Sequence, residues 1–134
     1  MQLSARRIRV FASNRAGIHG AGSAFDAVKN HGAIRGVGEG LQGNSYAIPT
    51  KDARLKSLSL REISSGVSRF LSFAEKHPEL EFDVVKVGCG LAGYKPEEIA
   101  PMFIGYPPNV KLHVDFLRVL GIEVEEKTGG SKGE

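Results

Sequence analysis

Two groups of glycines and one lysine are the residues whose types and spacing point to chemistry. The glycines are Gly17, Gly20 and Gly22 in the first group and Gly88, Gly90 and Gly93 in the second. Each group follows a short apolar segment and precedes a helical pattern. Glycine lets the backbone approach a ligand closely, and amides at the start of a helix attract phosphate. The spacing therefore predicts a pyrophosphate cradle, and the alternative is that these glycines serve only tight turns.

Lys51 ends a third short apolar segment, and Asp52 follows it directly. An ammonium at this place neutralises a phosphate, whereas an uncharged amine acts as a nucleophile. The alternative is a solvated lysine in a loop. An aspartate carboxylate facing the amine would stabilise its charged form, which opposes the role of nucleophile.

The elements that must position these groups alternate between strands and helices. We expect strands over residues 7–12, 45–49, 82–87 and 109–112, and a short strand around Ile34. We expect helices over residues 21–30, 60–77 and 115–120, and a short helix from Pro96 that Pro101 ends. This alternation predicts a mostly parallel sheet with helices on its faces. Loops after parallel strands share one edge, where ligands bind, so the glycines and Lys51 are expected to meet there.

Composition limits the class of protein. The 134 residues fit one domain, which we expect over residues 1–122, with the charged and Gly/Ser-rich residues 123–134 as a flexible tail. Cys89 is the single cysteine, which excludes an internal disulfide and suits a reducing cytoplasm. No run of about 18 apolar residues predicts a membrane span. The net charge of +3 favours an anionic ligand, but no block of basic residues indicates a nucleic-acid surface.

Three motifs carry a resemblance to a known family. Residues 14–24 (NRAGIHGAGSA) resemble the N-x-x-G-x-x-G-x-G-x-A loop of macrodomains, in particular of terminal ADP-ribose glycohydrolases and of antitoxins that strip ADP-ribose from DNA. Residues 49–51 (PTK) and 88–91 (GCGL) are similar to two further motifs of those antitoxins. The motifs span about residues 8 to 104 in the family's order. Residues 38–51 also resemble a group of small phage and prophage proteins of unsettled function.

The resemblance implies a three-layer α/β fold, a mostly parallel mixed sheet flanked by helices, with an ADP-ribose-like nucleotide as ligand and no metal or cofactor. It assigns Asn14 to the distal ribose and the amides of Gly20, Ala21 and Gly22 to the pyrophosphate. Gly88, Cys89, Gly90 and Leu91 would wrap the phosphate and distal ribose from the other side. Lys51 matches a lysine that some of these hydrolases use at the anomeric carbon. The ligand-binding set is completed by Gly17, His19 and Thr50, which lie in the same motifs.

Two functions from different classes remain open. The first is an enzyme that removes ADP-ribose from modified DNA or protein in a bacterial cytoplasm. The second is a phage sponge that sequesters a host nucleotide signal without chemistry; a module that has lost the pocket is a third alternative. Protein-directed hydrolases carry an acid where this chain has Ala92, although the DNA-directed antitoxins lack it too. The early aspartate that reads adenine in the family is not evident.

Several other residues have two interpretations each. His19 contacts a phosphate or ribose, or it is a solvent-exposed loop residue. Cys89 packs a tight loop rather than acting as a nucleophile. Glu39 and Asp52 lie near the expected edge, where each is either a general base or a solvated surface carboxylate. Tyr46 and Tyr94 flank a base or ribose, or they pack a strand and a loop. The remaining histidines, His31, His77 and His113, have no ligand partners at metal-binding spacing.

Overall fold

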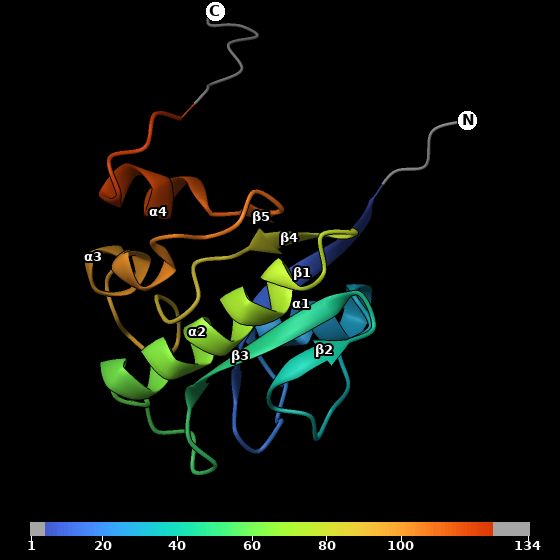
Figure 1. Cartoon of the computed structure of the whole chain (residues 1–134). Coiled ribbons are helices and arrows are strands. Elements are labelled where there is room, and N and C mark those ends of the chain that lie inside the picture. Colours follow the sequence, from blue (N-terminus) through green and yellow to red (C-terminus); the bar gives the residue numbers. More distant parts are fainter. Residues whose placement is uncertain (1–4, 125–134) are drawn as a thin grey trace, which may run out of the picture.

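The computed structural model describes residues 5–124, so the expected tail beyond Val124 and residues 1–4 of the expected domain lie outside the described residues. Its strands are β1 (Arg6–Asn14), β2 (Gly40–Gln42), β3 (Ser45–Lys51), β4 (Leu80–Val84) and β5 (Val110–Lys111). Its helices are α1 (Gly22–Asn30), α2 (Leu60–Glu75), α3 (Pro96–Ile99), the 3-10 helix η1 (Ala100–Phe103) and α4 (Val114–Val119) (Figure 1). Between residues 5 and 124, no helix has the length and apolar character needed to cross a bilayer.

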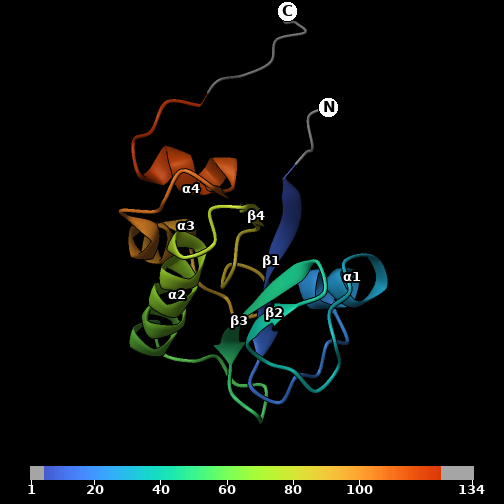
Figure 2. The same cartoon turned by 45° about the vertical axis from the view of Figure 1, so that its right-hand side comes forward.

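The five strands form one sheet in the order β2-β3-β1-β4-β5. All neighbouring pairs are parallel except β2 and β3, which are antiparallel. Helix α1 covers one face, and α2, α3 and α4 cover the other (Figure 2). The structure is therefore a three-layer α/β fold with a mostly parallel mixed sheet, as expected. Its carboxyl edge collects the loops that follow β1, β3 and β4.

The two faces of the sheet have cores of different size. On the α2 side, Ile8 and Val10 of β1 join a large cluster in which Phe70, Phe82 and Phe103 are fully buried. On the α1 side, Phe11 belongs to a small cluster whose other buried members are Ala24, Ala27, Ala33 and Ala47. Because successive side chains of a strand face opposite sides, Val10 and Phe11 serve different cores. The small residues allow the start of α1 to lie close to the sheet.

Helix α2 begins and ends where local chemistry predicts. The Ser59 hydroxyl accepts a hydrogen bond from the Glu62 amide at 3.1 Å, and the Glu62 carboxylate accepts one from the Ser59 amide at 3.0 Å. This reciprocal capping box satisfies two amides that the first helical turn leaves unpaired. Its apolar face buries Ile63, Val67 and Phe70 against the sheet. The expected helix over residues 60–77 is thus confirmed to within two residues.

Two expectations about strands are wrong. Residues around Ile34 form no strand, because Gly36 adopts a φ of +94° and the Ile34 amide donates to the Gln42 side chain at 2.7 Å instead. The short strand of this region is β2. Pro49 does not close β3, which continues to Lys51. Pro49 has no amide hydrogen for the ladder, but the Thr50 hydroxyl donates to the Ser13 carbonyl and the Arg15 amide donates to the Lys51 carbonyl.

Candidate functional site

A cavity of about 640 Å³ opens at the carboxyl edge of the sheet. Its floor is formed by the ends of β1, β3 and β4, one wall by the start of α1, and the other by the loop over residues 88–92. The residues that the motif resemblance assigns to the site all line it except Gly17 and His19. Gly93 of the second glycine group does not line it either. The lining residues that sequence reasoning missed are Ala12, Ser13, Ile18, Ser23, Ala24, Leu55, Val85, Lys86 and Ala92.

The wall at the start of α1 presents backbone rather than side chains. The N-cap residue is Ala21, which has no side chain able to cap the helix. The first amides of a helix lack intrahelical partners and carry partial positive charge. The Ser23 hydroxyl accepts a hydrogen bond from the Ala12 amide at 3.3 Å, which fixes the first turn against β1. These amides form a wall suited to an anion.

Asn14 holds the loop between β1 and α1 in shape. Its side-chain amide donates to the Ile18 carbonyl at 2.6 Å, and its side-chain oxygen accepts from the Ile18 amide at 2.9 Å. Its backbone carbonyl also accepts from the Gly17 amide at 3.0 Å. One N–H of the Asn14 side chain has no bond within the loop, since the group carries two. A contact to a ligand is therefore compatible with this structural role.

The opposite wall is the tight loop after β4. Gly88 has a φ of +81°, and a Cβ there would lie 3.0 Å from Ile99 Cδ1, so both conformation and space favour glycine. Leu91 is 70% exposed, and its Cδ1 lies 3.8 Å from the position of a Cβ on Gly22. The loop over residues 88–92 therefore reaches across to the start of α1. Gly20 and Gly22 of the first glycine group therefore face Gly88 and Gly90 of the second over the cavity.

Lys51 lies at the end of β3, and its side chain has no hydrogen-bond or ion-pair partner among residues 5–124. The Asp52 carboxylate accepts hydrogen bonds from the Arg54 amide at 2.8 Å and the Lys56 amide at 3.0 Å. Both bonds lower the pKa of Asp52, and the bond from the Lys56 amide has the larger effect. The Asp52 carboxylate is thus hydrogen-bonded within its own turn and not to the Lys51 amine. Asp52 does not line the cavity.

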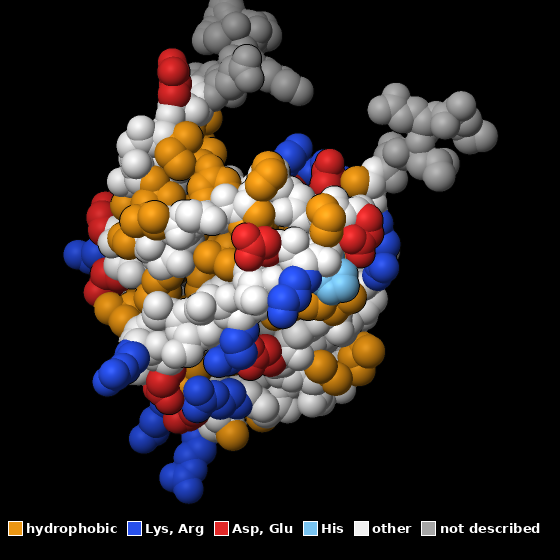
Figure 3. Space-filling view, in the orientation of Figure 1, with side chains coloured by type: hydrophobic (Ala, Val, Ile, Leu, Met, Phe, Trp, Pro, Cys, Tyr) orange, Lys and Arg blue, Asp and Glu red, His pale blue; other side chains and the backbone are white. Residues whose placement is uncertain are grey.

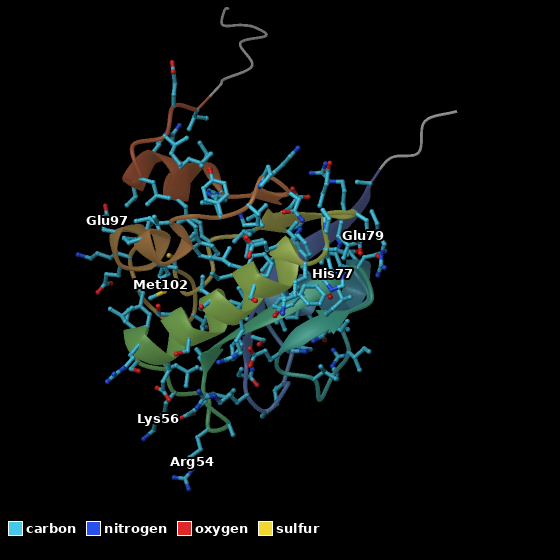
Figure 4. The ribbon with its side chains drawn as sticks, viewed as in Figure 1. Arg54, Lys56, His77, Glu79, Glu97 and Met102 are labelled. Carbon is cyan, nitrogen blue, oxygen red and sulfur yellow. The ribbon has the colours of Figure 1, made fainter. Side chains whose placement is uncertain are left out.

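The turn after β3 shapes the mouth of the cavity. Leu55 has a φ of +66°, a conformation that no other non-glycine residue adopts within residues 5–124. It is 46% exposed and lines the cavity together with the exposed side chains of Ile18 and Leu91. Figure 4 shows Arg54 and Lys56 on the same turn, pointing away from the molecule. Figure 3 shows further basic side chains around this end. The mouth therefore combines an aliphatic rim with positive charge.

Lys86 is the cavity-lining cation that sequence reasoning missed. Its Nζ lies 3.0 Å from the carboxylate of Asp115 in the first turn of α4. The expected strand over residues 82–87 contained Lys86, but β4 ends at Val84 and releases it toward the cavity. A lysine in an otherwise apolar run was the available signal. Its partner comes from a distant segment, so the pair itself was not predictable.

Lys86 and Asp115 predict a pH-dependent contribution to stability. The hydrogen bond from Lys86 outweighs partial burial and lowers the pKa of Asp115 below its ordinary value of 3.8, with smaller effects of His113 and Arg118. A carboxyl whose pKa is lower in the folded state stabilises the fold above its ordinary pKa, and this contribution is lost as the pH falls below it. The stability difference between the wild type and Lys86→Met should therefore shrink on acidification. Denaturant unfolding from about pH 6 to about pH 3 measures it, and a constant difference would contradict the ion pair.

Two predicted ligand contacts, His19 and Gly17, are placed elsewhere. The His19 ring is fully buried, stacks edge-on against Phe11 at 5.3 Å, and bonds through Nε2 to the Val37 carbonyl at 3.0 Å. It is neither at the cavity nor exposed to water, so both interpretations of it are wrong. Gly17 is buried, and a Cβ there would lie 2.3 Å from the Gly36 carbonyl carbon. It is required for close backbone packing beneath the loop.

The other candidates serve the fold. Arg69 donates two hydrogen bonds to Glu39, at 2.6 and 3.1 Å, which holds this carboxylate away from the cavity lining. Burial between β3 and α2 raises the pKa of Tyr46 to about 12. The Tyr94 hydroxyl donates to the Leu58 carbonyl. The packing interpretation is thus confirmed for both tyrosines, and the general-base interpretation of Glu39 is wrong.

Cys89 lines the cavity but is poorly suited to act as a nucleophile. Burial raises the pKa of its thiol, an effect that the nearby charge of Lys86 opposes only in part. The reactive form of cysteine is the thiolate. Within residues 5–124, no group of three or more His, Cys, Asp or Glu side chains is arranged to hold a metal ion.

No protein-family model matches this sequence, and no curated protein sequence does. Among solved structures, the chain is similar to Thermosipho africanus DarTG in complex with ADP-ribose, with a TM-score of 0.55 and 18% sequence identity. The similarity covers 83% of this chain and 39% of that chain. The fold is macrodomain-like. This confirms the fold expected from the resemblance of the motifs, and in this macrodomain-like sheet the cavity lies where the predicted glycine loops converge.

Proposed function

We propose that this protein binds ADP-ribose or a closely related nucleotide in the cavity at the carboxyl edge of the sheet. The observation that carries the proposal is the pair of glycine loops facing each other there, one of them at an uncapped helix start. The pyrophosphate lies between the amides of residues 20–22 and the loop over residues 88–91. Asn14 and Thr50 complete the contacts from the floor, and Cys89 contributes from the loop over residues 88–91. The similar fold of a protein solved with ADP-ribose supports the choice of ligand.

The charges of the cavity support an anionic ligand. Lys51 and Lys86 line it, whereas no carboxylate does within the described chain. Aliphatic and small residues form most of the remaining lining. A cleft of one sign of charge raises the local concentration of an oppositely charged ligand. Its volume lies within the range of small-molecule sites, which are mostly apolar with a few placed polar groups.

The same lining favours binding without chemistry over hydrolysis. Among residues 5–124, neither a carboxylate nor an imidazole lines the cavity. General acid–base catalysis needs such a group within hydrogen-bond reach of the reacting atoms. The protein therefore acts as a sponge that holds a nucleotide signal, in keeping with the resemblance of residues 38–51 to small phage and prophage proteins. Removal of ADP-ribose from DNA or protein is the second candidate, and it depends on Lys51.

Calorimetry followed by analysis of the recovered ligand tests both functions. We expect heat of binding and a raised unfolding temperature with ADP-ribose, because a ligand that binds only the folded state stabilises it. Cyclic ADP-ribose isomers and NAD, run in parallel, define the preferred relative. After heat denaturation, mass spectrometry of the supernatant should return the ligand intact. Absence of heat and of a thermal shift with every nucleotide would contradict the proposed binding, and recovery of a cleaved product would contradict the sponge.

A further inference from the structure

The two cavity cations lie at opposite ends of the floor. In the sheet, β1 lies between β3 and β4, and Lys51 ends β3 whereas Lys86 follows β4. Neighbouring strands are about 4.8 Å apart, so the ends of β3 and β4 are about 10 Å apart. The start of α1 is fixed to β1 through Ser23 and Ala12, so its amides lie between the two ends. A nucleotide with its phosphates at these amides therefore extends toward Lys51 on one side and Lys86 on the other.

The two ends differ in charge and in access. The charge of Lys86 is partly compensated by Asp115, a carboxylate that also pairs with Arg118. The Lys86 ammonium still offers two N–H donors, because an ammonium has three. Lys86 itself lines the cavity, which places the pair at its edge. Lys51 has no such partner among residues 5–124, and it lines the cavity together with the exposed Leu55 at the mouth. A neutral group rich in acceptors suits the first end, and a group that continues into solvent suits the second.

We propose that Lys86, positioned by Asp115, binds the nucleoside end of the ligand. The base and its ribose lie over β4, and the distal ribose lies over β3 beside Lys51. The ring nitrogens and sugar oxygens of a nucleoside are neutral acceptors for the free N–H groups of Lys86. The assignment rests on the proposed function. The resemblance of the motifs already implies the distal ribose beside Lys51, and the pair of Lys86 and Asp115 adds the residues that hold the opposite end.

Two fragments of the ligand test this direction on the 134-residue chain. ADP carries the nucleoside end with both phosphates, and ribose 5-phosphate stands for the distal end. By calorimetry, Lys86→Met should weaken ADP and ADP-ribose about tenfold and leave ribose 5-phosphate unchanged. Lys51→Met should weaken ribose 5-phosphate and ADP-ribose and leave ADP unchanged. Lys111→Met, at an exposed lysine of β5 outside the cavity, is the matched control and should change none of them.

A double-mutant cycle tests the positioning role of Asp115. Asp115→Asn should weaken ADP in the wild type and have no further effect in the Lys86→Met background, because Asp115 acts through Lys86. Equal effects of Asp115→Asn in both backgrounds would overturn that role. A general loss of folding would weaken binding in both backgrounds, so it would not be mistaken for positioning of Lys86.

The outcomes separate this inference from the proposed function. Two results overturn the inference alone, provided that the wild-type protein binds ADP-ribose. In the first, Lys86→Met leaves the affinity for ADP intact. In the second, Lys86→Met weakens ribose 5-phosphate and Lys51→Met weakens ADP. Wild-type protein that binds neither ADP-ribose nor ADP overturns both. Unfolding temperatures of all variants are measured beside the titrations, so that a variant that fails to fold is replaced by Lys86→Gln or Lys51→Gln.

Discussion

Gly20→Val is expected to abolish nucleotide binding while leaving the protein folded. Gly20 is exposed and lines the cavity, and its φ lies outside the left-handed region that favours glycine. A Cβ at this position meets nothing within 4 Å, so valine is accommodated without strain in the empty protein. Its methyl groups occupy the space through which a phosphate must approach the amides of residues 20–22. Loss of two charge-assisted hydrogen bonds corresponds to a fall in affinity of about a hundredfold or more.

Comparison with other glycine variants makes this test specific. Gly20→Ala should lose less affinity than Gly20→Val, because the obstruction grows with the side chain. Gly22→Val is a poorer test, since Gly22 has a φ of +62° and a valine there strains the backbone whether or not ligand binds. Calorimetry gives the affinity, and thermal unfolding shows that the fold is intact. Full affinity in a folded Gly20→Val protein would remove the start of α1 from the binding site.

The parts of the site that could be predicted from the sequence depend on short-range patterns. Glycines placed directly after apolar segments indicated the two walls, since loops after parallel strands share one edge whatever the details of the sheet. The capping box at Ser59 and Glu62 and the break at Pro101 are local as well. For Asn14 and Lys51, the cavity position followed from the motifs in which they lie. These features do not depend on which distant residues meet.

The parts that could not be predicted depend on contacts between distant segments. Gly17 belongs to the same spacing as Gly20, but its conformation serves packing against Gly36, which no local pattern reveals. His19 lies in a glycine-rich loop without a periodic pattern, and its contacts with Phe11 and the Val37 carbonyl explain its burial. Lys86 lay within an expected strand, and its role depends on Asp115 of α4. In each case, the partner in the fold decides whether the side chain faces the cavity or the core.

Lys51→Ala is expected to separate an enzyme from a binder. As a nucleophile, the uncharged Lys51 amine forms a bond to the anomeric carbon while the leaving group departs with the bonding electrons, and water then releases the sugar. The amine must first lose a proton, and the described lining holds no carboxylate or imidazole to accept it. We therefore expect no turnover by the wild type on ADP-ribosylated DNA or protein. Lys51→Ala should then lose only one charge-assisted contact, about 1.5–3 kcal/mol of binding free energy.

Lys51→Arg is the matched control, because it keeps the positive charge and removes the nucleophilic amine. For a binder, this variant should retain most of the affinity that Lys51→Ala loses. For an enzyme that uses Lys51, both variants should lose turnover by orders of magnitude with ligand affinity retained in the arginine form. Affinity comes from calorimetry with ADP-ribose, and turnover comes from release of ADP-ribose from modified substrate, read by mass spectrometry. Robust wild-type turnover that survives Lys51→Ala would contradict both the expected lack of turnover and the role of Lys51 as a nucleophile. It would direct attention to Lys86 and Cys89, the other titratable side chains that line the cavity within residues 5–124.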